Sequence, residues 1–181
     1  MAEGIRLLVV DDHPVFRRGL LAVLSDADDV EVVGAVGTGS EALEAAAGLA
    51  PDIILLDLNL PDTNGIDVTK KLLDSEFSGQ VLVLTMDLED AALVSAMDAG
   101  ARGYLLKGAS QEEIISGIRS VVSGGMVFGA QVSAQVAARV IAADRRHLPA
   151  LTAREAEVLA LMAGGQRNSE IARRLLLVAE T

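Results

Sequence analysis

Short apolar runs recur through the N-terminal part of the chain, and each is followed by a side chain that can do chemistry. Apolar runs without regular polar alternation are typical of strands buried on both faces of a sheet. A more alternating run over residues 30–36 suits a strand at the edge of the sheet. The runs that indicate buried strands are Ile5–Val10, Ile53–Leu56, Val81–Leu84 and Tyr104–Leu106.

Segments with helical periodicity separate these runs, and local signals mark where the helices begin. Pro14 suits the first position of a helix. Thr38 with Glu41 has the spacing of a capping box, as does Ser110 with Glu113. No strand pattern returns after residue 125. The alternation therefore predicts an α/β domain over residues 1–125, with a five-stranded parallel, doubly wound sheet.

The remainder of the chain has a different character. Residues 126–149 are predicted to form a linker, in which the Ala/Val-rich residues 130–143 form either a helix or a partly ordered segment. Residues 150–181 predict a small all-α module whose helices, over 153–163 and from 168 or 169 to 175, are separated by Gly164-Gly165. Two helices around such a turn fit the first half of a helix-turn-helix.

Composition excludes several classes of function. Without Cys the chain has no disulfide, no thiolate nucleophile and no sulfur-ligated zinc. No apolar run approaches the roughly 18 residues that a membrane span needs, so a cytoplasmic location is expected. Residues 1–130 carry 8 basic and 21 acidic residues, net −13, whereas residues 131–181 carry 7 and 5, net +2. Any contact with nucleic acid would therefore come from the C-terminal module.

The polar residues that end the strands form the most informative pattern. Asp11 and Asp12 end the first run, Asp57 the second, Thr85 the third and Lys107 the fourth. In an open α/β sheet, ligands bind beyond the carboxyl ends of the strands, at the point where strand order reverses. Each group could instead be an ordinary residue that begins a loop, but so many at four strand ends favour a shared site.

Three carboxylates in one crevice repel one another unless a cation compensates them, and Mg²⁺ accepts such oxygen ligands. We expect Asp11 and Asp12 to hold the metal together with Asp57 and a backbone carbonyl near Asn59. An Asp carboxylate can also be a nucleophile that forms an aspartyl-phosphate. Asp57 is the candidate, because its loop of residues 58–65 would be exposed at the mouth of the crevice.

Lys107 and Thr85 supply a point charge and a hydroxyl donor, which suit phosphoryl oxygens. Two nearby features receive structural interpretations. His13 lies beside the acidic residues and could be a ligand or a base, but its position before Pro14 favours a helix-entry residue. Gly37-Thr-Gly-Ser40 resembles a phosphate cradle, but it lacks the lysine of a P-loop and is better explained as a capped helix start.

These motifs resemble the flavodoxin-like receiver domain of two-component response regulators, over about Ile5 to Gly124. The C-terminal module resembles the opening of the DNA-binding domain of the NarL/LuxR class. The resemblance rests on Asp11-Asp12-His13, on Asp57-Leu-Asn-Leu-Pro-Asp-Thr-Asn-Gly65, on Thr85, on Gly103-Tyr-Leu-Leu-Lys107, and on Leu151-Thr-Ala-Arg-Glu-Ala-Glu-Val-Leu159 with Asn168-Ser-Glu-Ile-Ala-Arg-Arg-Leu175.

The resemblance implies a phosphorylation-controlled transcription regulator rather than an enzyme. A sensor histidine kinase would phosphorylate Asp57, with Mg²⁺ at the acidic residues. Movement of Thr85 would be coupled to Tyr104 and would alter the face made by the fourth helix, fifth strand and fifth helix, which suggests a homodimer. In an intact output domain, Arg173 and Arg174 would contact DNA phosphates.

One departure from the family is important. The helix that reads DNA bases in this class lies beyond the sequence that matches residues 178–181. The chain as written is therefore expected not to bind a specific operator. We expect an incomplete, proteolysed or engineered chain, with a natural truncation as the alternative.

Two other functions stay open. A Mg²⁺-dependent phosphohydrolase with an Asp nucleophile would place an acid two residues after it, where this chain has Asn59. A receiver that responds to a ligand or partner without phosphorylation would keep the fold, although the complete set of acids, Thr85 and Lys107 argues against it.

Overall fold

The computed structural model describes residues 4–75, 77–86, 89–130 and 132–133. Contacts divide the chain into two units, residues 1–135 and 136–181, and the description below concerns the first. The two predicted C-terminal helices lie outside the described residues, as does most of the Ala/Val-rich segment over residues 130–143. Their structure, and the predicted domain boundaries, stay predictions.

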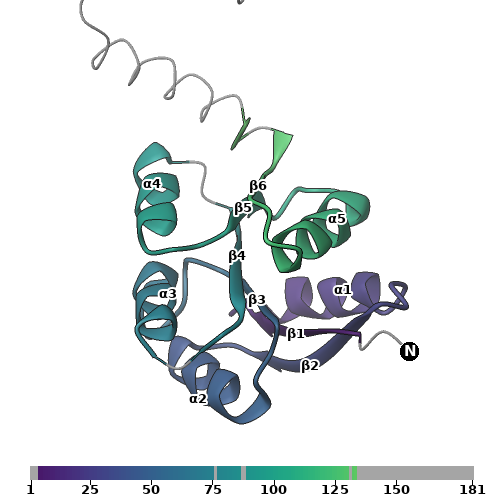
Figure 1. Cartoon of the computed structure of the whole chain (residues 1–181), viewed down its shortest axis with the longest axis horizontal. Helices are drawn as coiled ribbons and strands as arrows, with labels where there is room; N and C mark the ends of the chain where they lie inside the picture. Colours follow the sequence, from purple (N-terminus) through teal and green to yellow (C-terminus); the bar gives the residue numbers. More distant parts are fainter. Residues whose placement is uncertain (1–3, 76, 87–88, 131, 134–181) are drawn as a thin grey trace, which may run out of the picture. The chain divides into compact units, whose positions relative to one another are not determined.

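The described residues form a parallel sheet with strand order β2-β1-β3-β4-β5-β6 (Figure 1). All five predicted strands are present, and the alternating one, β2, lies at an edge as expected. The order reverses between β1 and β3, which places the switch point there. The strands are β1 (Ile5–Val10), β2 (Val30–Val36), β3 (Ile53–Leu56), β4 (Gln80–Thr85), β5 (Gly103–Leu106) and β6 (Val127–Phe128).

Helices cover both faces of this sheet, which confirms the doubly wound class. In Figure 1, α1 and α5 lie on one face, and α2, α3 and α4 lie on the other. None of the helices described is both long and apolar enough to cross a bilayer. The helices are α1 (Pro14–Leu24), α2 (Gly39–Leu49), α3 (Gly65–Leu73), α4 (Asp90–Asp98) and α5 (Gln111–Val122).

The predicted helix starts are present. Pro14 is the first residue of α1. Thr38 and Glu41 form a reciprocal capping box at α2, in which each side chain accepts from the other residue's backbone. At α5, the Ser110 hydroxyl accepts from the amide of Glu113 at 3.2 Å. The caps of α2 and α5 satisfy backbone donors that a helix leaves without partners in its first turn, so the turns before these two helices end at defined residues.

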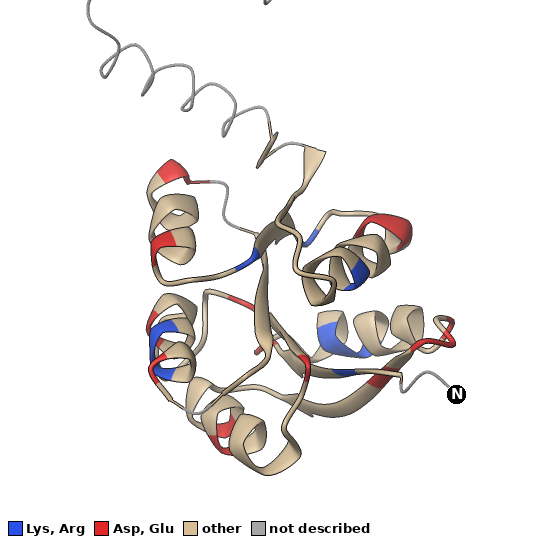
Figure 2. Cartoon of the chain, viewed as in Figure 1, with Lys and Arg blue, Asp and Glu red and all other residues tan. Residues whose placement is uncertain are grey.

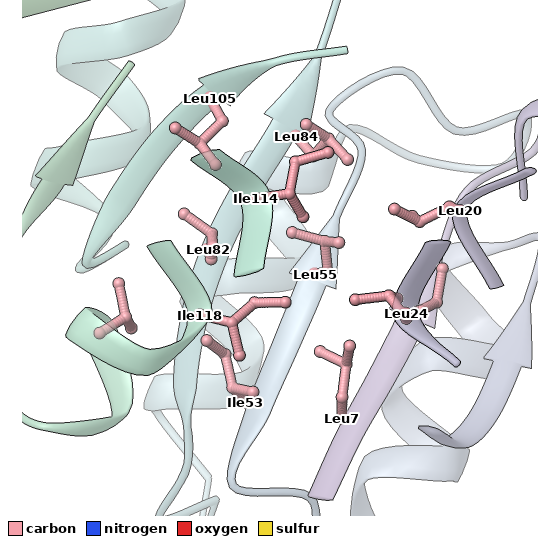
Figure 3. Close-up of a cluster of buried hydrophobic side chains, with 12 residues drawn as sticks. Leu7, Leu20, Leu24, Ile53, Leu55, Leu82, Leu84, Leu105, Ile114 and Ile118 are labelled. Atoms are coloured by element: carbon pink, nitrogen blue, oxygen red, sulfur yellow. The ribbon is translucent and has the colours of Figure 1, made fainter. Parts of the chain in front are cut away.

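The core between the sheet and the pair α1 and α5 is a continuous layer of aliphatic side chains (Figure 3). Alternate residues of the central strands point into it, as the pleat of a strand requires. Leu82 on β4 is fully buried there. The strand members are Leu7, Val9, Ile53, Leu55, Leu82, Leu84 and Leu105, and the helix members are Leu20, Leu24, Ile114, Ile118 and Val121.

The structure differs from the sequence-based expectation after residue 125, where a sixth strand is present. β6 pairs in parallel with β5. The amide of Val127 donates to the carbonyl of Arg102 at 3.1 Å, and Gly129 donates to Tyr104 at 3.0 Å. The prediction of five strands was wrong because two apolar residues are too short a run to signal a strand. Their pairing depends on the open edge of β5, which only the fold creates.

The residues after β6 pack on the same unit. Val132 is fully buried. The amide of Ala130 donates to the Glu113 carboxylate of α5 at 3.1 Å, and the Ser133 hydroxyl donates to the carbonyl of Phe128 at 3.0 Å. The first residues of the predicted linker are therefore hydrogen-bonded to β5 and α5.

Replacing Leu82 with alanine is expected to lower the free energy of unfolding by about 2–5 kcal/mol, because it removes buried methyl groups and leaves a cavity. Denaturant unfolding of the full chain measures the loss. Leu73→Ala makes the same chemical change at a side chain that is 37% exposed, and its cost should be less than half as large. Equal losses in the two variants would contradict the packing described.

Val132→Ala tests whether the segment after β6 belongs to the folded unit. It removes two methylene equivalents from a buried site, which corresponds to about 1.5 kcal/mol of unfolding free energy at about 0.8 kcal/mol each. Denaturant unfolding, followed by circular dichroism, provides the value. A variant as stable as the parent would show that this segment does not pack on the sheet.

Candidate functional site

The register of the strands brings the predicted polar residues together at one end of the sheet. Val10 of β1 is paired with Leu56 of β3, so the residues that follow them, Asp11 and Asp57, are neighbours. The amide of Asp57 donates to the carbonyl of Val10 at 2.9 Å. The first two carboxylates therefore meet at the switch point between β1 and β3, as predicted.

Lys107 completes this cluster from two strands away. Its Nζ lies 2.6 Å from Asp11 Oδ2 and 2.7 Å from Asp57 Oδ2, and each of the three side chains is at most 3% exposed. Elsewhere in the described part of the chain, charged residues lie mainly on helices and loops (Figure 2). Buried carboxylates are costly unless they are paired. The ammonium group therefore neutralises two acids that would otherwise repel each other.

The electrostatic environment keeps Lys107 charged. Burial by itself would lower its pKa, but hydrogen bonds to Asp11 and Asp57 and the charges of both acids outweigh burial, so the pKa lies above its usual value. The ring of Phe16 adds a further contact, since Nζ lies 4.8 Å from its centroid. Lys107 therefore acts as a fixed positive charge at the site.

The imidazole of His13 lies beside the same cluster, the place that its sequence position next to the two acids indicates. His13 is the N-cap residue of α1, as expected for a helix-entry position. Its Nδ1 also lies 2.5 Å from Asp12 Oδ1, 3.6 Å from Asp11 Oδ1 and 4.0 Å from Asp57 Oδ2. The signal was in the sequence, because an N-cap directly after the two acids has to lie beside them.

The donor set fits a hard divalent cation. Oxygen and nitrogen atoms of Asp11, Asp12, His13 and Asp57 all lie within 4.8 Å of one another. Asp12 Oδ1 is buried, with His13 Nδ1 at 2.5 Å. Carboxylate oxygens gathered in this way are the ligands that hard divalent cations prefer.

The loop after Asp57 is closed at its base. The amide of Asn59 donates to Asp57 Oδ1 at 3.3 Å, and Asn59 forms an isolated bridge with Asn64. The amide of Gly65 donates to the carbonyl of Leu58 at 2.8 Å. A Cβ at Gly65 would overlap the Asp57 carbonyl, so only glycine permits this approach. The carbonyl region around Asn59 is thereby held close to Asp57.

Thr85 and Tyr104 are both buried, Thr85 completely and Tyr104 at 1% exposure. Tyr104 is paired with Val83, two residues before Thr85 on β4. Residues at such diagonal positions share one face of a sheet. This placement brings the two members of the predicted switch onto one face. Arg173 and Arg174, the candidate DNA contacts, lie outside the described residues.

Two family models match the chain. The model described as "Response regulator receiver domain" matches residues 7–119. The model described as "Bacterial regulatory proteins, luxR family" matches residues 149–181. The two matches cover the two parts that the sequence analysis separated.

Curated relatives match nearly the whole length of the chain. The nitrate/nitrite response regulator protein NarL of Escherichia coli (strain K12) is 36% identical over 99% of this chain and 84% of its own length. The transcriptional regulatory protein LiaR of Bacillus subtilis (strain 168) is 36% identical over 98% of this chain and 85% of its own. The signal receiver domain of a NarL from Mycobacterium tuberculosis is 35% identical, with a TM-score of 0.66, over 67% of this chain and 98% of that domain.

Replacing Lys107 with methionine is expected to lower the free energy of unfolding by about 3 kcal/mol in buffer without divalent ions, because two buried carboxylates lose their shared counter-charge. Denaturant unfolding measures the effect. Lys70→Met, which removes an exposed lysine from α3, is the control and should cost less than about 0.5 kcal/mol. A Lys107 variant as stable as this control would show that Lys107 does not neutralise the acids.

Proposed function

Because the chain belongs to the two-component response regulators, with a receiver domain and a LuxR-type DNA-binding domain, we propose that it is switched by phosphorylation of Asp57. The observation that carries this proposal is the single ammonium group of Lys107, in contact with both Asp11 and Asp57. A lysine in that position can follow the negative charge when Asp57 acquires a phosphoryl group.

In the proposed reaction, an oxygen of the Asp57 carboxylate attacks phosphorus and forms a new O–P bond. The bond from phosphorus to the donor breaks, and the donor leaves with the electron pair. When the donor is a phosphohistidine of a sensor kinase, the imidazole is the leaving group. Mg²⁺ bound by Asp11 and Asp12, with Asp57 and the carbonyl near Asn59, would supply positive charge opposite the phosphoryl oxygens.

The remaining residues position the group rather than react. Lys107 offers its charge, and Thr85 a hydroxyl, to the phosphoryl oxygens. Displacement of Thr85 toward the phosphate would free space on the sheet face that it shares with Tyr104. We infer that this rearrangement alters the face of α4, β5 and α5 and promotes a homodimer. Arg173 and Arg174 would then contact DNA phosphates in an output domain complete with its recognition helix.

Incubation with acetyl phosphate and Mg²⁺ is expected to add one phosphoryl group to the chain, and Asp57→Asn is expected to abolish the addition. Intact-mass measurement, with peptide mapping in acid, locates the group. Asp67→Asn, an exposed change in the first turn of α3, should leave labelling within about twofold of the parent.

Two outcomes would favour the alternatives. An unlabelled chain, under conditions that label another receiver, would support regulation by a ligand or partner without phosphorylation. Efficient turnover of small phosphoesters would support a phosphohydrolase. A phosphohydrolase of this kind needs an acidic side chain two residues after the nucleophile to donate a proton to the leaving group, and this chain has Asn59 there. Only the backbone N–H of Asn59 contacts Asp57, as a hydrogen-bond donor.

A further inference from the structure

The Gly37-Thr38-Gly39-Ser40 segment binds an anion, and that anion is a side chain of this protein. Asp62, from the loop after Asp57, accepts hydrogen bonds from the amide of Gly39 at 2.8 Å and the amide of Ser40 at 2.9 Å. It also accepts from the Ser40 hydroxyl at 2.8 Å. The motif that resembled a phosphate cradle in the sequence is thus filled by a carboxylate.

The donors at the start of α2 are divided between two acids. Glu41 accepts from the amides of Gly37 and Thr38, at 3.0 and 3.1 Å, and Asp62 accepts from the two amides that follow. The first amides of a helix have no backbone carbonyl of that helix to donate to, and the positive end of the helix dipole favours a negative charge beside them. The hydrogen bonds from Gly39 and Ser40 lower the pKa of Asp62 to about 2.

Gly39 permits this approach because it has no side chain. A Cβ at that position would overlap Thr63 Cγ2 and would lie 2.8 Å from Val68 Cγ2. The tip of the loop therefore rests directly against the start of α2. Any larger residue at position 39 would push the loop, and Asp62 with it, away from the amides.

The loop that follows Asp57 is consequently held at two places. At its base, Asn59 bridges to Asn64, and Gly65 lies against Asp57. At its tip, Asp62 is bound by α2. The tip contact joins segments 22 and 23 residues apart in sequence. The backbone at Asn59, which is proposed above as a metal ligand, belongs to the base of this loop, three residues before Asp62.

We propose that Asp62 is a positioning residue: by binding the first amides of α2, it holds the loop in the conformation in which the backbone near Asn59 can bind Mg²⁺ beside Asp57. This inference rests on the proposed function of the site. Because both oxygens of its carboxylate are bound by Gly39 and Ser40, Asp62 would act on how readily the site accepts Mg²⁺ rather than on the maximal rate of transfer.

The test compares Asp62→Ala with Asp67→Ala, which removes another exposed acid close in sequence but outside this contact. Titration of each full-length variant with Mg²⁺, followed by the amide signals of Asp57 and Asn59 in NMR spectra, gives a dissociation constant. We expect Asp62→Ala to raise it about fivefold, which corresponds to roughly one net hydrogen bond, and Asp67→Ala to change it less than twofold. Asp62→Asn, which keeps one acceptor oxygen, should fall between.

Labelling with acetyl phosphate separates positioning from a general loss of structure. The Asp62→Ala variant should be labelled more slowly than the parent at low Mg²⁺ concentration. Its labelling rate should equal that of the parent when Mg²⁺ saturates the site. Equal Mg²⁺ affinities in the two alanine variants, with the Gly39 and Ser40 amides of Asp62→Ala newly open to hydrogen exchange, would overturn the inference. If Asp62→Ala fails to fold, Asp62→Asn provides the same comparison.

The two proposals can fail separately. A parent chain that binds Mg²⁺ but takes no phosphoryl group would refute phosphorylation of Asp57. The Mg²⁺ titrations would still decide the role of Asp62.

Discussion

The arrangement depends on one buried ammonium group that is shared by two buried carboxylates. Asp11 and Asp57 come from adjacent strands on either side of the switch point, and Lys107 arrives from β5, which is separated from β3 by β4. Such a cluster is stable only when all three charges meet, because an unpaired charge at this depth costs several kcal/mol. The strand order and the registers are therefore requirements of the site as well as of the core.

The site is also connected to two surrounding elements through backbone contacts. The loop after Asp57 is held by its own base and by the start of α2. On the other side, β5 contains Tyr104, is followed directly by Lys107, and lies between β4 and β6. The amide of Gly129 donates to the carbonyl of Tyr104. A change in the position of Tyr104 would therefore act directly on the first residues of the predicted linker.

Local signals in the sequence were sufficient for much of this structure. Thr38 with Glu41 predicted the cap of α2 because a capping box involves residues only three positions apart. Asp11, Asp57 and Lys107 could be placed at one edge because the carboxyl ends of parallel strands must lie together. β6 was missed because two apolar residues carry no periodicity. His13 was expected beside the acids and at the start of a helix, and the structure shows both, because the N-cap residue follows the two acids directly.

The sequence by itself determined which residues end the strands, where the helices begin, and that acidic and ammonium groups would meet at one edge of the sheet, since each of these follows from short-range spacing. Only the tertiary structure decided that Lys107 contacts both acids, that Asp62 binds the amides of α2, and that β6 adds to the edge of β5. These contacts join residues far apart in the chain, and their geometry depends on how the sheet and helices pack, which no local pattern records.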